Sequence, residues 1–330
     1  MKVKNIAIIG GAGFLGNSLS KTLRESSEDF SILDLHNPYD EENFIEFNVE
    51  SKDTMNLMSN FDCLINLAAV HRDDIRPISR YDDVNVGGAK NICDIARKND
   101  IKKIIFTSSV AIYGFAPENT NESGEANFFN DYGRTKYLAE QVYKDWFNED
   151  PNNRSLIIIR PTVIFGEGNR GNVYNLLKQI ASKKFVMCGD GKNIKSMAYV
   201  KNVSAFIKHI TNYKQGLHIF NYIDKPDMDM NSLISLIRKT LFKKNNVGFR
   251  LPASLAVITG NIFDLLSWII NKNLPISRIR IEKFLKTTSF NTSVEKTGFI
   301  APFSLSEGLK RTIRYEFLED NKDKKEFFTE

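Results

Sequence analysis

The residues that point most directly to chemistry lie in and just before NDYGRTK, residues 130–136. Tyr132 and Lys136 are four positions apart, so on a helix their side chains share one face. Ser109 ends the run FTSS. A tyrosine with its ordinary pKa near 10 stays protonated at neutral pH and cannot act as a base there. A nearby ammonium favours the phenolate and lowers that pKa. The pattern predicts proton transfer by Tyr132, tuned by Lys136, while the Ser109 hydroxyl holds the reacting oxygen.

A glycine pattern near the N-terminus predicts a dinucleotide site. GGAGFLG follows the apolar run NIAII and places Gly10, Gly13 and Gly16 three residues apart. Glycine permits a tight turn and a close approach of the backbone to a pyrophosphate, and the helix that begins there offers free N–H groups. Asp34 ends the next apolar run, where its carboxylate can accept from a ribose diol and repel a 2′-phosphate. We therefore expect NAD rather than NADP, and the charge of oxidised nicotinamide also favours a phenolate at Tyr132.

These candidates sit at the ends of apolar runs that alternate with helical patterns. The sequence predicts strands at 5–10, 30–35, 63–69, 103–109 and 155–161, and helices at 14–26, around 83–99 and at 131–148. This alternation is typical of an α/β protein with a Rossmann-like, doubly wound parallel sheet.

We expect two domains. An NAD-binding domain should span 1–165, and a smaller α/β substrate-binding domain should span 166–330, with part of 195–222 returning to the first. The tail EDNKDKKEFFTE is expected to fray.

Charge is distributed unevenly along the chain. Residues 1–150 carry 16 basic and 25 acidic residues, a net charge of −9, whereas the remainder carries 29 and 15, a net charge of +14. A basic second half is compatible with a diphosphate-bearing substrate, an anionic membrane surface or nucleic acid. The three cysteines are far apart, so we expect reduced thiols, no disulfide framework and no metal site. The short apolar start runs into the glycine pattern, so we expect no export signal.

With these motifs, the chain resembles the extended short-chain dehydrogenase/reductases, in particular the NAD-dependent sugar epimerase/dehydratase group. The resemblance runs nearly end to end and also includes NLAA (66–69), NVGGAKNI (85–92), TSSVAIYG (107–114) and RPTVIFG (160–166). It implies a Rossmann fold, a retained NAD, and oxidation of a sugar hydroxyl to a ketone by catalytic residues Ser109, Tyr132 and Lys136.

The same resemblance implies which residues bind the cofactor. Lys136 should also hold the nicotinamide ribose, and two positions depart from the family pattern: Asn48-Val49 replaces an Asp-Ile or Asp-Val pair at the adenine, and Asn66 replaces a common His. Neither position transfers a hydride or a proton, so we infer no loss of activity from them. The implied cofactor-binding residues are Gly10, Gly13, Phe14, Leu15, Gly16, Asp34, Asn48, Val49, Leu67, Ala68, Ala69, Asn85, Tyr132, Lys136, Pro161 and Val163.

The family's activities diverge after the first oxidation. Dehydratases of the family commonly carry an Asp-Glu pair after the active-site hydroxyl residue, but Val110-Ala111 follow Ser109 here. Dehydration is therefore disfavoured, which leaves a 4-epimerase or a 4-keto reductase. By resemblance, Asn172-Val173 should meet the substrate diphosphate. Lys195 stands where many relatives have an Arg. Its ammonium keeps the positive charge but cannot form the two parallel hydrogen bonds of a guanidinium, and Arg170 would compensate for that loss.

An apolar segment in the second half has two interpretations. Residues 251–270 contain one charge, Asp264, and a polar stripe at helical spacing formed by Gly260, Asp264, Ser267 and Asn271. Pro252 and Asp264 shorten the apolar length too much for a membrane-spanning helix. Either an interfacial helix lies on a membrane, flanked by the basic residues Lys272, Arg278, Arg280, Lys283 and Lys286, or an amphipathic helix packs on protein.

Longer segments resemble one bacterial subgroup of the family, the epimerases that act on GlcNAc-diphospho-undecaprenol in O-antigen and capsule pathways. These segments are AAVHRDDI (68–75), residues 158–180, KSMAYV (195–200) and NYIDKPDMDMN (221–231). The subgroup implies epimerisation of lipid-linked GlcNAc to GalNAc in lipopolysaccharide synthesis, by an enzyme in the bacterial cytoplasm that touches the inner membrane face over residues 251–286.

Three alternatives remain open at this point. One is a soluble UDP-glucose or UDP-GlcNAc 4-epimerase with a nucleotide-linked substrate, and a second is a reductase of nucleotide-linked 4-keto-6-deoxysugars. A third, a degenerate dinucleotide-binding sensor or RNA-binding protein, is disfavoured because Ser109, Tyr132 and Lys136 are intact. We expect no nucleic-acid partner, and the family resemblance leaves a homodimer open.

Overall fold

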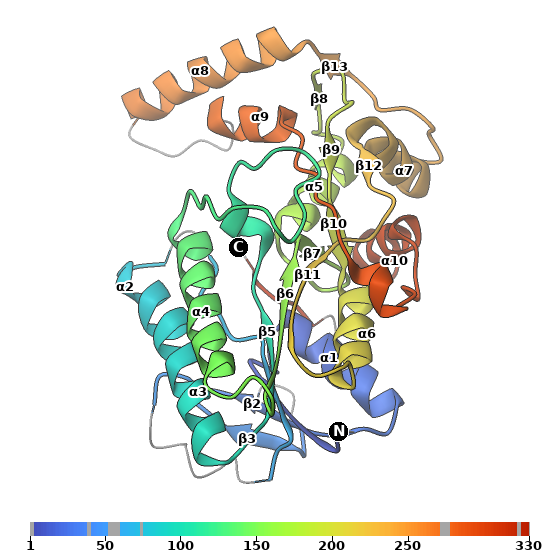
Figure 1. The fold of residues 1–330 in the computed structure, drawn as a ribbon. Coiled ribbons are helices and arrows are strands. Elements are labelled where there is room, and N and C mark those ends of the chain that lie inside the picture. Colours follow the sequence, from blue (N-terminus) through green and yellow to red (C-terminus); the bar gives the residue numbers. More distant parts are fainter. Residues whose placement is uncertain are drawn as a thin grey trace.

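The computed structural model describes residues 3–37, 41–51, 60–72, 75–270, 278–321 and 325–329. Seven parallel strands form a central sheet with the order β11-β6-β5-β4-β1-β2-β3 (Figure 1). This order confirms the predicted Rossmann-like, doubly wound α/β fold. The strands are β1 (Asn5–Ile9), β2 (Asp29–Asp34), β3 (Phe44–Glu46), β4 (Cys63–Asn66), β5 (Lys103–Thr107), β6 (Ser155–Pro161) and β11 (Leu217–Tyr222).

Both faces of the sheet are covered because its strands are apolar on both sides. In β1, Ile6 and Ile8 pack into the cluster on one face, and Ala7 and Ile9 pack into the cluster on the other. Successive residues of a strand point to opposite faces, so an uninterrupted apolar run requires a helix layer on each side. One layer contains α1 (Phe14–Glu25) and α6 (Val200–Thr211), and the other contains α3 (Gly88–Lys98) and α4 (Asp131–Asn148).

The sheet is wider than the five predicted strands. The three-residue strand β3 is too short to leave a periodic signal, and it pairs with β2. At the other edge β11 pairs with β6 after α6 has packed against α1, so this part of the chain lies in the Rossmann layer. The helix predicted around 83–99 is three pieces in succession, α2 (Ser79–Tyr81), the π-helix η2 (Asp82–Gly87) and α3.

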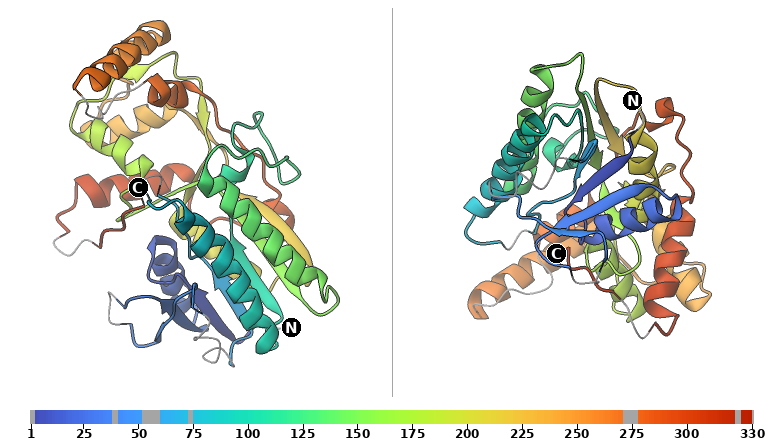
Figure 2. Two further views of the ribbon diagram at one scale, coloured as in Figure 1. Left: turned by 90° about the vertical axis from the view of Figure 1, so that its left-hand side faces the viewer. Right: turned by 90° about the horizontal axis from the view of Figure 1, so that it is seen from below.

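The rest of the second half lies beyond the carboxyl ends of the strands (Figures 1 and 2). Its helices enclose a third core cluster, to which Leu177, Ile234 and Leu309 contribute. Three small two-stranded sheets connect the helices. The elements are α5 (Asn172–Ala181), α7 (Met230–Phe242), α10 (Leu305–Phe317), β7 (Val163–Phe165) with β10 (Met197–Tyr199), β8 (Met187–Cys188) with β13 (Arg250–Leu251), and β9 (Ile194–Lys195) with β12 (Met228–Asp229).

The apolar segment forms α8 (Ala253–Ile270), which lies with α9 (Arg278–Leu285) at the end of the molecule farthest from β3 (Figure 1). Its polar stripe faces α9: Asp264 Oδ2 accepts from the Arg278 backbone N–H at 3.1 Å, and a Cβ on Gly260 would come within 2.8 Å of the Arg278 Cα. Asn271 and Lys272 lie outside the described residues. Within the described part of the chain, no helix has the length and apolar character needed to cross a membrane.

Candidate active site

The structure brings Ser109, Tyr132 and Lys136 together at the carboxyl end of β5. Ser109 follows this strand and caps the short helix η3 (Val110–Tyr113), where its Oγ accepts from the Ala111 N–H at 3.1 Å. Helix α4 begins after Asn130, whose side chain accepts from the Gly133 N–H at 2.9 Å. Tyr132 therefore lies in the first turn of α4, and its hydroxyl is hydrogen-bonded to Ser109.

Gly133 allows this contact because α4 approaches η3 closely. A Cβ on Gly133 would lie 2.5 Å from the carbonyl oxygen of Ala111, a distance that no real side chain tolerates. The residue after the tyrosine in NDYGRTK must therefore lack a side chain if Tyr132 is to reach Ser109.

Lys136 is buried with 2% of its surface exposed. Its Nζ donates to the carbonyl oxygen of Thr107 at 2.7 Å and lies 4.7 Å from the centre of the Phe106 ring. Burial removes water from the ammonium and lowers the pKa of Lys136 to about 7, and the Glu140 carboxylate partly opposes this change. Lys136 is thus a lysine that can exchange its proton near neutral pH.

The pKa of Tyr132 differs from the sequence-based expectation. Burial raises it to about 12, and the hydrogen bond with Ser109 only partly opposes the rise. The neighbouring ammonium was expected to lower this pKa, but Lys136 points at Thr107 and Phe106, and the desolvation of the phenolate is the larger effect. The protein alone therefore keeps Tyr132 protonated, and the positive charge of an oxidised nicotinamide is needed to favour the phenolate.

Glu140, on α4 with Tyr132 and Lys136, connects the end of β5 to β6, and sequence reasoning missed it. Its fully buried carboxylate accepts from Ser108 Oγ at 2.6 Å, from Arg160 Nε at 2.8 Å and from Arg160 Nη2 at 2.6 Å. Ser108 precedes Ser109, and Arg160 precedes Pro161 at the end of β6. The signal was present as an Arg within the apolar run SLIIIRP and an acid one turn after Lys136, because a charge in a buried element needs a partner.

The glycine loop fits a dinucleotide. Gly10 has φ +76°, and a Cβ there would lie 2.6 Å from the Ala68 N, while a Cβ on Gly16 would lie 2.5 Å from the Gly11 carbonyl oxygen. The N-cap of α1, Gly13, makes no side-chain hydrogen bond, so the first-turn N–H groups face a cradle suited to a pyrophosphate. Asp34 Oδ2 accepts from the Ala12 N–H at 3.0 Å, which places its carboxylate beside the loop at the ribose position.

The remaining predicted cofactor residues lie along the same sheet edge. Leu67, Ala68 and Ala69 follow β4, and Pro161 and Val163 lie at the junction of β6 and β7. Asn85 is buried and fully engaged: its Oδ1 accepts from the Val70 N–H, and its Nδ2 donates to the Val70 carbonyl oxygen and to Thr135 Oγ1. Asn85 therefore shapes the loop after β4. Val49 packs against Gly88, and Asn48 Oδ1 accepts from the Glu50 N–H.

The predicted substrate residues lie in the second half, and two of them already have partners. Arg170 pairs with Glu316 at 3.0 Å and with Glu326 at 2.6 Å. Lys195 Nζ donates to the carbonyl oxygens of Lys283 and Lys286, which cap the end of α9, and burial lowers the pKa of Lys195 to about 8.

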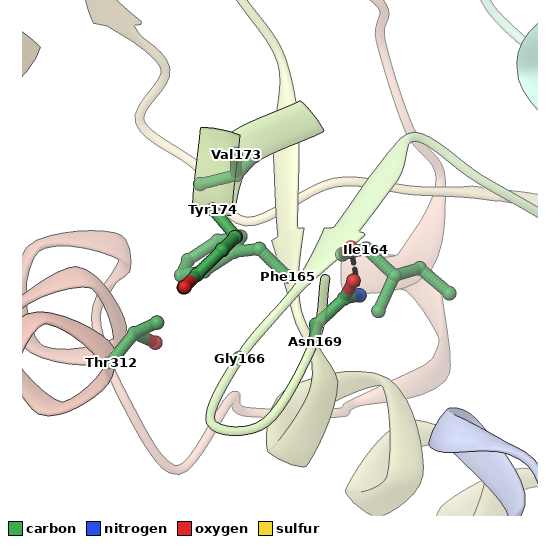
Figure 3. A pocket seen from close by; sticks show the side chains of 7 residues that line it. All are labelled: Ile164, Phe165, Gly166, Asn169, Val173, Tyr174 and Thr312. Atoms are coloured by element: carbon green, nitrogen blue, oxygen red, sulfur yellow. Dashed lines mark hydrogen bonds between the residues drawn. The ribbon is translucent and has the colours of Figure 1, made fainter. Parts of the chain in front are cut away.

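Asn172 and Val173 begin α5, close to the loop that follows β7. Figure 3 shows this loop around a small cavity, with Asn169 Nδ2 donating to the Ile164 carbonyl oxygen at 3.2 Å. The loop is thereby held against β7 and presents the beginning of α5.

Lys136→Met should change the pH dependence of folding stability. The folded-state pKa near 7 lies below the ordinary 10.5, so between these pH values the unfolded chain binds one more proton and the wild-type free energy of unfolding rises with pH. The advantage of K136M over the wild type should shrink by up to about 1.4 kcal/mol per pH unit from pH 7 upward. Urea unfolding from about pH 6 to 9.5, a range that begins below the folded-state pKa and covers most of the change, measures this, with K90M at an exposed lysine of α3 as control. A difference that does not vary with pH contradicts the buried ammonium.

Comparison with known proteins identifies the family of this chain. Residues 6–222 match the NAD dependent epimerase/dehydratase family. The chain is 46% identical over 332 residues, covering 99% of both proteins, to the N-acetyl-alpha-D-glucosaminyl-diphospho-ditrans,octacis-undecaprenol 4-epimerase of Escherichia coli O157:H7.

Two solved structures share the fold at low sequence identity. The UDP-N-acetylglucosamine 4-epimerase from Methanobrevibacter ruminantium M1, in complex with UDP-N-acetylmuramic acid, is 21% identical, with a TM-score of 0.73 over 96% of this chain and 98% of that chain. The UDP-glucuronic acid 4-epimerase from Bacillus cereus in complex with NAD is 18% identical, with a TM-score of 0.71 over 94% and 98%. Together with the glycine cradle and the Ser109–Tyr132–Lys136 arrangement, the family match means that this chain belongs to the NAD-dependent epimerase/dehydratase family.

Proposed function

We propose that this protein is a 4-epimerase that converts GlcNAc-diphospho-undecaprenol to GalNAc-diphospho-undecaprenol for surface polysaccharide synthesis. The observation that carries the proposal is the 46% identity, over 99% of both chains, to an enzyme named for this lipid-linked substrate. The likeness includes the second half, where a substrate carrier would be distinguished.

Each residue of the candidate site then has a role. Tyr132 takes the proton from the sugar O4, and Ser109 holds that oxygen. NAD held at the cradle of Gly10, Gly13 and Gly16 would supply hydride transfer at C4, by which a 4-keto sugar forms and is then reduced on its opposite face. Lys136 holds the nicotinamide ribose and supplies positive charge beside Thr107, and Glu140 keeps that charge from being lost entirely to burial. Tyr132 finally returns its proton to O4.

The outer side of α8 supports a membrane-bound substrate. Leu255, Ile258 and Ile262 each expose half or more of their surface, at 50%, 52% and 53%. A helix on a soluble protein normally turns its apolar side inward, whereas α8 turns its polar stripe toward α9. An apolar face of this kind, with basic residues on α9, matches the chemistry of an anionic membrane surface.

A second apolar feature lies between this face and the catalytic residues. Phe115 and Phe129 are half exposed and stack with their ring centres 4.8 Å apart. The ammonium groups of Lys283 and Lys286 lie over these rings, at 5.3 Å from the Phe129 centre and 4.2 Å from the Phe115 centre. Phe129 is three residues before Tyr132, so this aromatic pair offers an apolar path from the catalytic tyrosine toward α9 and α8.

The diphosphate of the carrier needs positive charge or free N–H groups. Helix α5 begins at Asn172 and Val173, and a helix N-terminus favours anions through its partial positive charge. Arg170 precedes α5 and Lys195 lies on β9, and each must exchange a present partner, Glu326 or the end of α9, to bind phosphate.

The substrate proposal is tested by assaying GlcNAc-diphospho-undecaprenol and UDP-GlcNAc side by side with one preparation of enzyme. We expect conversion of the lipid-linked sugar and little or no conversion of the UDP-linked sugar. Turnover of UDP-GlcNAc alone would replace the proposal with a soluble nucleotide-sugar epimerase, and stoichiometric consumption of NADH on a 4-keto sugar would indicate a reductase.

Tyr132→Phe should lower the turnover rate by about 10²- to 10⁴-fold, because it removes the group that transfers the O4 proton. NAD should stay bound, because the ring is kept. Tyr137→Phe, one residue beyond Lys136 on the same helix, is the matched control and should retain activity. Turnover by Y132F at the wild-type rate would remove Tyr132 from the mechanism.

Binding to the membrane is tested with vesicles. Ile258→Asp combined with Ile262→Asp should reduce cosedimentation with phosphatidylglycerol-containing vesicles by about tenfold or more, because two charges would enter the interface. Ile300→Asp is the control, since Ile300 is 87% exposed on a different part of the molecule. If both variants bind vesicles like the wild type, α8 does not contact lipid. If the α8 variant instead dissociates a dimer in sedimentation experiments, α8 binds a second copy.

A further inference from the structure

The C-terminal residues 325–329 are docked, not frayed. Phe327 N–H donates to the Gly168 carbonyl oxygen at 2.9 Å, and the Arg170 N–H donates to the Phe327 carbonyl oxygen at 2.8 Å. These two bonds add the segment as a parallel bridge to the loop between β7 and α5. Thr329 Oγ1 donates to Asn169 Oδ1 at 2.7 Å, and Glu326 pairs with Arg170 at 2.6 Å.

The loop has the shape that this docking requires. Gly168 has φ +84°, and a Cβ there would lie 2.4 Å from the Lys325 carbonyl oxygen. A Cβ on Gly171 would lie 2.6 Å from Thr329 Oγ1. Any side chain at either glycine would therefore collide with residues 325–329.

The segment also reaches two places on the Rossmann sheet. The Phe327 ring packs on the Phe14 ring at 5.6 Å between centres, in the first turn of α1. The backbone carbonyl of Thr329 lies near the ring of His71, in the loop after β4. Figures 1 and 2 show the C-terminus at the carboxyl end of the sheet, within the body of the molecule.

These two contacts lie on opposite sides of the cofactor groove. In a doubly wound sheet, the dinucleotide binds in the crevice where the strand order reverses. Here that crevice lies between β1 and β4, which are neighbours in the sheet. Phe14 belongs to the loop and helix that follow β1, and His71 follows β4. A segment that joins Phe14 to His71 crosses over the crevice.

We propose that residues 325–329 form a C-terminal strap that closes over bound NAD and retains it between turnovers. The strap is held by Gly168, Asn169 and Arg170 on one domain and by Phe14 and His71 on the other. NAD cannot leave past the strap without breaking the Phe327–Phe14 contact. The proposal concerns cofactor exchange, and NADH release can be measured without any sugar substrate.

The test measures NADH release from purified protein by stopped-flow fluorescence, with excess NAD⁺ as the competitor. Phe327→Ala should raise the dissociation rate constant about threefold to tenfold, since an aromatic pair contributes on this scale beyond its buried area. A chain shortened after Asn321 should show a larger increase and should lose NAD on gel filtration. Phe328→Ala is the matched control, because the Phe328 side chain is 64% exposed, and it should release NADH at the wild-type rate.

Two further measurements keep the outcome interpretable. The melting temperature without added cofactor shows whether each variant is folded, and if the shortened chain does not fold, F327A alone decides. Wild-type dissociation rates in both F327A and the shortened chain would overturn the strap. If the wild-type protein does not convert the lipid-linked substrate, the proposed substrate is wrong. The strap proposal is unaffected by that result, because NADH release is measured without substrate.

Discussion

The site depends on a positive charge that water cannot reach. Lys136 is 2% exposed, and its pKa falls to about 7 because burial disfavours the ammonium. The surrounding structure offsets part of this cost through the Thr107 carbonyl, the Phe106 ring and the Glu140 carboxylate. Glu140 in turn is a buried charge that needs Arg160, and removing one member of such a pair leaves an uncompensated charge. The buried Lys136 ammonium thus requires partners on three elements: Thr107 on β5, Glu140 on α4 and, through Glu140, Arg160 on β6.

The sequence predicted most of the fold because long apolar runs and glycine spacing are local signals. Five of the seven sheet strands and the helices α1 and α4 were predicted close to their observed bounds. The short strand β3 and the late strand β11 were missed, because pairing with a distant neighbour leaves no mark within the strand itself. The Glu140–Arg160 pair is 20 residues apart in sequence, and its partners could be matched only after the sheet had assembled. The tail was expected to fray because chain ends are poorly ordered unless they are tied down, yet Phe327 packs on Phe14 while Phe328 is exposed.

Helix α8 shows why a hydrophobic pattern can have two valid interpretations. The polar stripe contains Gly260 and Asp264, and its spacing is compatible with an interfacial helix on a membrane or with an amphipathic helix packed on protein. In the structure this stripe meets α9, so polar atoms are used to hold two helices together. The apolar side is left outward as a result. Periodicity identified the two sides correctly, but only the neighbouring helix determines which side is covered.

Gly133 sets the separation of the two hydroxyl-bearing residues by what it lacks. A methyl group there would overlap the Ala111 carbonyl oxygen at 2.5 Å, and relief of that overlap would push the start of α4 away from η3. Tyr132 lies on the same turn, so its hydroxyl would retreat from Ser109 by a similar amount. Reaction rates depend steeply on such displacements. The residue that follows the tyrosine therefore acts as a spacer: in this chain the smallest amino acid sets how closely Tyr132 approaches Ser109.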